Sequence, residues 1–511
     1  MVFAVSRRDL CLLLASAVLT TLAYPPFHLF LPSFVCLVPA VLLLEKSNSN
    51  PLPLRSLLVM GFWFGILSNG LLLYWMVFAL WRYTPLSVLG YAGTVLLLSV
   101  YSSALFAVSG WVVRATRISI LVVFPVLWTA QEWILAHQGD LRFPWLGLGT
   151  SLTGFPTIIQ TADIVGARGI TFLLALANTA LALAWMRRFQ LRQSVILVGA
   201  VGTGIFAALA YGVVRERSLD IRSVGEVTLL QPNVSYREKR DPALWEVIVS
   251  SLLESSEIAQ SESNPDLIVW PEAVVPGYLN RHRDWQVRIS SLARQTSTPI
   301  VVGGLHHVSL SDSTIVGYNS AFIIDSAGRT DEYPVYHKQY LVPITERVPF
   351  LPQGLVDSRW FGSFATGEGG AVYELGLGGF GVLICYESAF ENLSRGYRLK
   401  GADFLVNITN DAWFGRSSTP YQHASHLVMR AIENRIGIAR AANTGVSEFV
   451  DPLGREHKRT ALEVETHISG IVKTSDVLTV YTRLGDWVGS AVVLMALTLV
   501  GYAWWREKKP V

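Results

Sequence analysis

The sequence has few charged residues. Asp, Glu, Lys and Arg make up 15% of its 511 residues, while 51% are hydrophobic. Soluble globular domains carry roughly 25% charged residues, so this composition indicates a membrane protein. The net charge of +3 is too small to indicate a nucleic-acid partner, and we expect none.

The chain is also poor in cysteine, with Cys11, Cys36 and Cys385 as its three residues of this type. The first two lie in apolar runs near the N-terminus and the third lies far from them. Neither a metal-ligand spacing nor a disulfide framework can be built from this set. We therefore expect no metal ion and no other cofactor. A solitary cysteine such as Cys385 is either an inert, buried residue or a nucleophile.

Hydrophobic residues are concentrated at the two ends of the chain. A membrane-spanning helix needs roughly 20 apolar residues. The sequence predicts about eight such helices, at approximately 9–23, 27–44, 56–80, 86–113, 118–136, 164–186, 194–214 and 487–505. The first is expected to be retained, because no small-residue cleavage site follows it. The second is short and contains prolines, which favours a tilted or partly re-entrant segment.

Lys and Arg residues predict how these helices are oriented, because cytoplasmic loops carry an excess of both. With the N-terminus inside, the inner side holds Arg7, Arg8, Lys46, Arg55, Arg114, Arg117, Arg187, Arg188, Arg192, Arg506, Lys508 and Lys509. The short outer loops hold Arg82, Arg142 and Arg168. We therefore expect residues 1–214 to form seven membrane helices and 215–486 a periplasmic domain. Residues 487–511 would form the last helix and a basic cytoplasmic tail.

The segment 215–486 has the pattern of a mixed domain. Short apolar runs predict strands at Val227–Leu230, Leu267–Trp270, Ile300–Gly303, Ser320–Ile324, Gly381–Ile384 and Phe404–Ile408. Helical patterns fall between them, as at Trp245–Ala259 and His423–Asn434. Because strands and helices alternate, the domain is expected to be α/β or α+β rather than all-β.

Three reactive side chains stand near strand-like or apolar segments of this domain. Glu272 follows the run that ends at Trp270, Lys338 lies among aromatic and apolar neighbours, and Cys385 ends the run Gly381–Ile384. Taken singly, an exposed glutamate or lysine is the better interpretation, and a buried cysteine is as good as a nucleophilic one. Together they could activate a thiol, because a free thiol has a pKa of roughly 8.5 and needs a base or a positive charge beside it.

In this order the three segments resemble the Glu–Lys–Cys triad of the nitrilase superfamily. Further segments resemble the apolipoprotein N-acyltransferase family across nearly the whole chain. These are Phe62-Trp-Phe-Gly65, Tyr74-Trp75, Phe143-Pro144-Trp145, Gly166-Ala-Arg-Gly169-Ile-Thr-Phe172, Thr409-Asn-Asp-Ala-Trp-Phe-Gly415, Arg430-Ala-Ile-Glu433-Asn434 and Asn443-Thr-Gly445. The resemblance implies a membrane helix bundle plus a periplasmic nitrilase-like domain, an α-β-β-α sandwich.

The resemblance also implies an activity and a set of roles. A fatty acyl chain would pass from a phospholipid to the α-amino group of a diacylglyceryl apolipoprotein, through a thioester on the enzyme. Cys385 would be the nucleophile, Glu272 the general base and Lys338 the oxyanion-stabilising cation. Glu346 would be a further acidic residue of the site, Tyr386 would lie beside oxyanion-binding backbone N–H groups, and Glu387 would orient the pocket. A monomer in the bacterial inner membrane is expected.

Two departures and two alternatives stay open. Where many family members have Lys-Trp, this chain has Lys239-Arg240, and Ile344-Thr345-Glu346 replaces the commoner Phe-Gly-Glu. The first departure puts an aromatic contact to the lipid in doubt. A membrane-tethered amidohydrolase would use the same triad with water as the second nucleophile. A non-catalytic lipid-binding scaffold is disfavoured, because all three reactive residue types are present.

Overall fold

The computed structural model describes residues 6–49, 52–81, 87–187, 190–311, 314–350 and 364–508. The chain divides into two compact units, one of residues 1–138, 142–218 and 484–511, the other of residues 139–141 and 219–483. Arg82, Arg188 and Lys509 belong to the Lys and Arg residues that predict the membrane orientation, and they lie outside the described residues. We describe each unit by itself.

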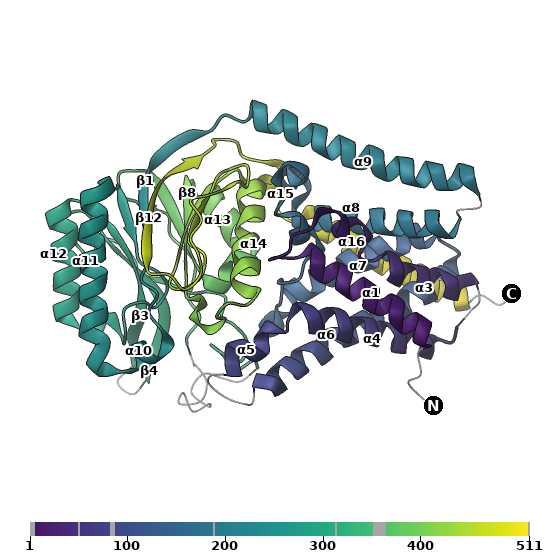
Figure 1. The fold of residues 1–511 in the computed structure, drawn as a ribbon, viewed down its shortest axis with the longest axis horizontal. Coiled ribbons are helices and arrows are strands. Elements are labelled where there is room, and N and C mark those ends of the chain that lie inside the picture. The colour runs from purple at the N-terminus through teal and green to yellow at the C-terminus, as the bar shows by residue number, and fades with distance from the viewer. Residues whose placement is uncertain are drawn as a thin grey trace. The chain divides into compact units, whose positions relative to one another are not determined.

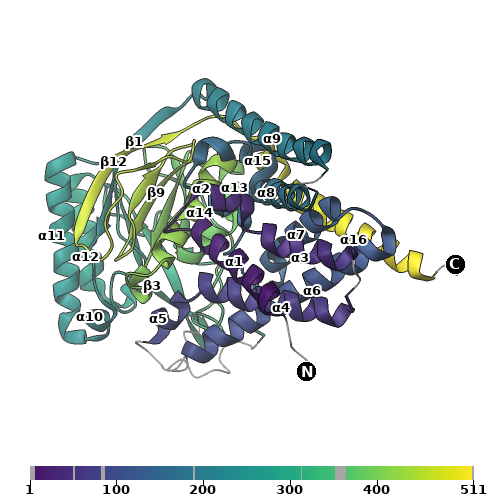
Figure 2. The same ribbon diagram turned by 45° about the vertical axis from the view of Figure 1, so that its right-hand side comes forward.

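The first unit is entirely helical (Figures 1 and 2). Six of its described helices are long and apolar enough to cross a membrane: α4 Leu54–Leu72, α6 Ser87–Thr116, α7 Ile120–His137, α8 Ala162–Met186, α9 Leu191–Ser218 and α16 Trp487–Lys508. Its remaining α-helices are α1 Arg7–Ala23, α2 Phe30–Val35, α3 Val38–Ser49 and α5 Trp75–Trp81. The chain is therefore a membrane protein, whereas the expected count of eight spans stays a prediction.

Two of the expected long helices are each interrupted. The run 27–44 forms α2 and α3, and the side chain of Asn178 on α8 satisfies the backbone at the break. Asn178 Oδ1 accepts from the Leu37 N–H at 2.8 Å, and its Nδ2 donates to the Ser33 carbonyl at 3.0 Å. Broken backbone within an apolar bundle requires such partners. The run 56–80 is likewise divided between α4 and α5.

Glycine spacing on α4 serves close helix packing. A Cβ atom at Gly61 would lie 2.5 Å from the Ser102 carbonyl oxygen, and one at Gly65 would lie 2.5 Å from the Ser99 Cα atom. Both neighbours belong to α6. The small residues thus allow the α4 and α6 backbones to approach each other, as small-xxx-small pairs do in membrane helices.

The second unit contains two six-stranded sheets, with strand orders β12-β1-β2-β3-β4-β5 and β11-β10-β9-β8-β7-β6. The first sheet is built from β1 Arg222–Gln231, β2 Leu267–Val269, β3 Ile300–Ser311, β4 Thr314–Ile324, β5 Tyr336–His337 and β12 Thr466–Thr474. The second is built from β6 Tyr373–Glu374, β7 Gly379–Ile384, β8 Phe404–Thr409, β9 Gly437–Ala442, β10 Glu448–Val450 and β11 Glu456–His457. The central strands β1, β2 and β3 are parallel, as are β7, β8 and β9.

Helices cover the outer face of each sheet and complete four layers (Figure 1). The helices α11 Trp245–Ser263 and α12 Arg283–Thr296 pack on the first sheet, and α13 Glu391–Leu399 and α14 Thr419–Asn434 pack on the second. The strands between them are buried on both faces, which explains their continuous apolar runs. The expected α-β-β-α sandwich is confirmed. Strands β5, β6, β9, β10, β11 and β12 were not expected from the sequence.

Candidate active site

The three reactive residues lie where strands of the two sheets end. Glu272 is in the turn after β2, Lys338 directly follows β5, and Cys385 directly follows β7 at the start of the short helix η6 Cys385–Ala389. Loops at the carboxyl ends of parallel strands are the usual place for sites in α/β folds. Glu272 is 4% exposed and Lys338 is 1% exposed, so both charged groups lie almost wholly out of water.

One ammonium group holds two carboxylates together. Lys338 Nζ lies 3.3 Å from Glu272 Oε1 and 2.8 Å from Glu346 Oε1. Burial alone would lower the pKa of Lys338, but the charges of Cys385, Glu272 and Glu346 outweigh it and raise the pKa well above its ordinary value. Lys338 is therefore a permanent cation at neutral pH, suited to stabilise negative charge and not to abstract a proton.

Asn319 on β4 is a further member of this cluster that sequence reasoning missed. Its Nδ2 atom donates to Glu272 Oε1 at 2.6 Å and to Glu346 Oε1 at 3.2 Å. Its backbone carbonyl accepts from the Lys338 N–H at 2.9 Å. An asparagine within a strand gives no signal in one sequence, because only the pairing of β4 with β5 brings it beside Lys338.

The loop after β8 supplies another donor to the general-base candidate. The backbone N–H of Asn410 donates to Glu272 Oε2 at 2.8 Å. Its neighbour Asp411 is bound by His423 Nδ1 at 2.9 Å and by Arg440 at 3.0 Å. Burial would raise the pKa of Asp411, but these two groups hold it below its ordinary value. This buried charged network fixes the loop that presents the Asn410 N–H to Glu272.

Cys385 has the backbone and the surroundings of a constrained thiol. Its φ of +52° lies in the left-handed region, where non-glycine residues store strain that often accompanies a functional site. The side chain is partly exposed. Burial and then the negative charge of Glu272 raise the pKa of Cys385 well above its ordinary value, against the opposing charge of Lys338. The resting group is thus a thiol, and its reaction as a nucleophile requires a base.

Glu387 connects the cysteine segment to the lysine segment. Its carboxylate accepts hydrogen bonds from the Ile384 N–H at 2.7 Å, the Tyr336 hydroxyl at 2.8 Å, the Gln339 N–H at 2.6 Å and the Tyr340 N–H at 3.2 Å. The side chain is completely buried, and burial raises its pKa to about 7. Glu387 therefore fixes the position of the Lys338 segment relative to the Cys385 segment.

Tyr386, which lies between Cys385 and Glu387 in the sequence, is also buried. Its ring packs edge-on against the ring of Phe390, with 5.1 Å between the centroids. Its expected position beside oxyanion-binding backbone groups stays a prediction. In the described part of the chain no group of three or more His, Cys, Asp and Glu side chains is arranged to hold a metal ion.

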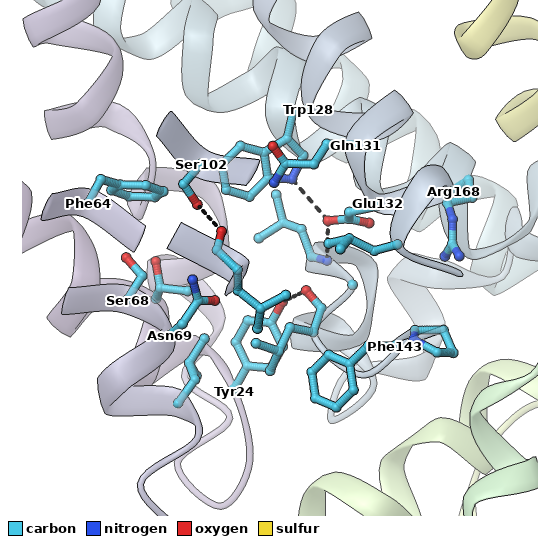
Figure 3. Close-up of a pocket in the computed structure, with 18 residues that line it drawn as sticks. Tyr24, Phe64, Ser68, Asn69, Ser102, Trp128, Gln131, Glu132, Phe143 and Arg168 are labelled. Atoms are coloured by element: carbon cyan, nitrogen blue, oxygen red, sulfur yellow. Dashed lines mark hydrogen bonds between the residues drawn. The ribbon is translucent and has the colours of Figure 1, made fainter. Parts of the chain in front are cut away.

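A small, mostly apolar cavity lies in the helical unit, lined by residues that include Glu132, Trp128 and Arg168 (Figure 3). Glu132 accepts hydrogen bonds from Trp128 Nε1 at 2.9 Å, the Leu148 N–H at 2.8 Å and Thr171 Oγ1 at 2.8 Å. The cavity volume of about 70 Å³ is far below the roughly 300–1,000 Å³ of ligand pockets. We interpret Glu132 as a clamp that satisfies irregular backbone between α7 and α8.

Together, the fold and the cysteine site define a domain of the carbon–nitrogen hydrolase type. The carbon–nitrogen hydrolase family model matches residues 227–474, and the model of the apolipoprotein N-acyltransferase N-terminal domain matches residues 16–180. A solved member of branch 10 of the nitrilase superfamily, from Saccharomyces cerevisiae, is 21% identical with a TM-score of 0.38, covering 49% of this chain and 90% of that one.

Full-length relatives identify the family. An apolipoprotein N-acyltransferase of Geobacter metallireducens is 33% identical over 519 residues, covering 99% of this chain and 97% of its own. An apolipoprotein N-acyltransferase of Bradyrhizobium diazoefficiens is 30% identical over 525 residues, covering 96% of this chain and 94% of its own. The chain belongs to the apolipoprotein N-acyltransferase family. The expected family and an acyltransferase activity are thereby confirmed.

Proposed function

We propose that Cys385, Glu272 and Lys338 are the catalytic residues of this acyltransferase, with a phospholipid as acyl donor and a diacylglyceryl apolipoprotein as acceptor. The observation that carries the proposal is the buried contact of Lys338 Nζ with Glu272 Oε1 at 3.3 Å, in electrostatic range of a thiol whose pKa is raised. Such a thiol needs the base that Glu272 supplies and the cation that Lys338 supplies.

In the first half-reaction Glu272 takes the proton of Cys385 as its sulfur attacks the ester carbonyl of the phospholipid. Lys338 and backbone N–H groups next to Cys385 stabilise the oxyanion that forms. The carbon–oxygen ester bond then breaks, the lysophospholipid oxygen takes the proton back from Glu272, and the acyl chain remains on the sulfur as a thioester.

In the second half-reaction the α-amino group of the apolipoprotein's N-terminal cysteine attacks the thioester. Glu272 accepts the proton that the amine loses, an amide bond forms and the carbon–sulfur bond breaks. The departing sulfur recovers its proton, which restores the thiol. No oxidant or cofactor is required, because the energy of the ester bond is carried through the thioester.

Glu346 has a supporting role in this scheme. It shares Lys338 with Glu272 and is held by the Val342 N–H at 2.8 Å. Two carboxylates on one ammonium group leave the trio negative, which opposes formation of a resting thiolate and keeps Glu272 available as a base.

The orientation is also part of the proposal. The Lys and Arg distribution places both termini in the cytoplasm and residues 215–486 in the periplasm of the inner membrane. There the catalytic domain would meet phospholipid at the outer leaflet, whereas a domain free in water would have to extract each acyl chain at roughly 0.8 kcal/mol per buried CH₂.

Intact mass measurement after incubation with phospholipid vesicles tests the proposed function. We expect a thioester adduct of one acyl chain on the full chain, removable by hydroxylamine and absent from Cys385→Ala. Release of free fatty acid with no transfer to an amine would instead identify a hydrolase, and an adduct that persists in Cys385→Ala would exclude this residue as the nucleophile.

A further inference from the structure

A second lysine approaches the turn that carries the proposed base. Lys239 lies on the short helix α10 Tyr236–Arg240, and its Nζ donates to the Ala273 carbonyl oxygen at 3.0 Å. Ala273 directly follows Glu272. This contact joins two segments that lie 34 residues apart in the sequence, and the scheme above gives Lys239 no role.

The turn needs an external restraint because its backbone is strained. Ala273 has a φ of +44°, in the left-handed region, where the backbone of a non-glycine residue is strained and persists only where neighbours fix it. On one side the turn is wedged against Gly303, whose added Cβ would lie 2.8 Å from the Glu272 Cα atom. On the other side the Ala273 carbonyl accepts from Lys239.

The backbone of Lys239 is itself fixed at both sides. Its N–H donates to the Ser235 carbonyl at 3.2 Å, and its carbonyl accepts from Trp245 Nε1 at 2.8 Å. Ser235 and Glu238 form a capping box that anchors the start of α10. The backbone that carries the Lys239 side chain is therefore held in a fixed position.

Charge adds a second reason for its position. Lys338 forms ion pairs with both Glu272 and Glu346, so these three groups together carry one unbalanced negative charge. The ammonium of Lys239 supplies a second positive charge close to Glu272. Burial lowers the pKa of Lys239 to about 8, against the opposing attraction of Glu272. This charge is consequently present at neutral pH and lost at moderately alkaline pH.

We propose that Lys239 is a positioning residue for Glu272, holding the Ala273 carbonyl so that the carboxylate faces Lys338 and Cys385, and balancing the second carboxylate of the site. The inference rests on the proposed function, because it requires Glu272 to be the base. Titratable and charged groups on α10 and the elements packed around it are Glu272, Arg237, Glu238, Arg240, Asp241, His282 and Asp411. Among them, the charge that acts on the pKa of Lys239 is that of Glu272.

Alkylation of Cys385 by a small water-soluble electrophile tests this role without a lipid substrate. The full chain in detergent is compared with Lys239→Met between pH 6.5 and 9.5, in a Cys11→Ser, Cys36→Ser background. We expect Cys385 to be labelled roughly tenfold faster at pH 7 in the protein with Lys239 than in Lys239→Met. This factor is the scale of one hydrogen bond to a charged group. The ratio of the two labelling rates should approach one above about pH 9, because the Lys239 side chain has then lost its charge.

Three controls make the test specific. Arg240→Met removes a cation from the same helix and should keep both the rate and the pH dependence. Lys239→Arg retains a charge that does not titrate, so its alkaline decline should disappear. In a Glu272→Gln background the Lys239→Met change should have almost no effect, because the base through which it acts is gone. Thermal unfolding, followed by tryptophan fluorescence, confirms that each variant is folded.

The outcomes distinguish this inference from the proposed function. A ratio that is constant with pH, or an equal effect of Arg240→Met, would overturn the role of Lys239 while Glu272→Gln still slows labelling. Normal labelling in Glu272→Gln would overturn the base assignment itself. An effect of Lys239→Met confined to the KM for phospholipid, with labelling unchanged, would make Lys239 a substrate contact and not a positioning residue.

Discussion

The carboxylate of Glu387 accepts a hydrogen bond of 2.8 Å from the hydroxyl of Tyr336. Both side chains are buried, and they belong to the two different sheets of the catalytic unit, through the segments that follow β7 and form β5. The contact ties the strand that ends in Cys385 to the strand that ends next to Lys338. The position of the ammonium group relative to the thiol therefore depends on a residue outside the triad.

Glu387 should make stability pH-dependent. Its pKa in the folded protein is about 7, above the ordinary 4.5, because burial disfavours the charged form. The folded state therefore binds the proton more tightly, so this contribution is complete below about pH 4.5 and is lost as pH rises through about 7. The free energy of unfolding of the native chain, measured by chemical denaturation, should fall over this window by up to roughly 3 kcal/mol more than that of Glu387→Gln. The same dependence of the free energy of unfolding on pH in the native chain and in Glu387→Gln would contradict this expectation.

Loss of Lys338 should affect both rate and stability. Lys338→Met should slow acyl-enzyme formation by roughly 10²–10³-fold, the scale for one oxyanion donor. It also leaves Glu272 and Glu346 without their shared cation, which should lower the free energy of unfolding by roughly 3–5 kcal/mol. Lys338→Met combined with Glu346→Gln should recover part of the stability but none of the rate, as measured by thermal unfolding and by thioester formation. Recovery of the rate would show that Lys338 acts only structurally.

Removal of the Asn319 amide should slow the reaction although Asn319 contacts no substrate in our scheme. Asn319→Leu keeps the volume but removes the donor to both carboxylates, and hydrogen bonds to charged groups contribute about 1.5–3 kcal/mol. We expect labelling of Cys385 to fall roughly 10–100-fold. Ser320→Ala is the matched control, because Ser320 is the next residue on β4 and bonds to His337. Equal effects of both substitutions would indicate general damage to β4.

A methyl group added at Gly303 should displace the general base. Its Cβ would lie 2.0 Å from the Pro271 carbonyl oxygen and 2.8 Å from the Glu272 Cα atom, so the turn must shift. Gly303→Ala should cost about 1–3 kcal/mol and slow labelling by up to roughly 10²-fold, since small misplacements are costly in catalysis. Gly304→Ala meets nothing closer than 3.4 Å and should leave both quantities nearly unchanged. Similar values for the two variants would argue against this steric account.

The proposed orientation can be tested with a reporter that is active only outside the cytoplasm. Fused after Asn264, in the exposed turn that follows α11, it should be active, and fused after Lys508 it should be silent. The two fusions control for each other, because they sit on opposite sides of the membrane in our scheme. A silent reporter at Asn264 would place the catalytic domain in the cytoplasm and remove its access to the outer leaflet.

Local patterns in the sequence were sufficient for the long apolar helices and for several of the buried strands, such as β7 and β8, because hydrophobic length and periodicity depend on neighbouring residues alone. They also singled out Glu272, Lys338 and Cys385 as candidates, and the resemblance to the nitrilase superfamily implied their roles. The prolines of the run 27–44 indicated a tilted or partly re-entrant segment, but the position of the interruption between α2 and α3 was not predicted. That position depends on Asn178 of α8, which supplies partners to backbone more than 140 residues away.

The remainder of the site was decided by tertiary structure. Asn319 carries no distinguishing local pattern, and the patterns that contain Lys239 and Asn410 did not indicate that either group contacts the Glu272 turn. The three groups become partners of the Glu272 turn only when β4 pairs with β5, α10 packs beside the Ala273 carbonyl, and the two sheets lie face to face. The sequence by itself determined which groups could react, since that is a matter of residue type. Their distances, burial and shared charges depend on contacts between distant segments, and only the folded chain sets those.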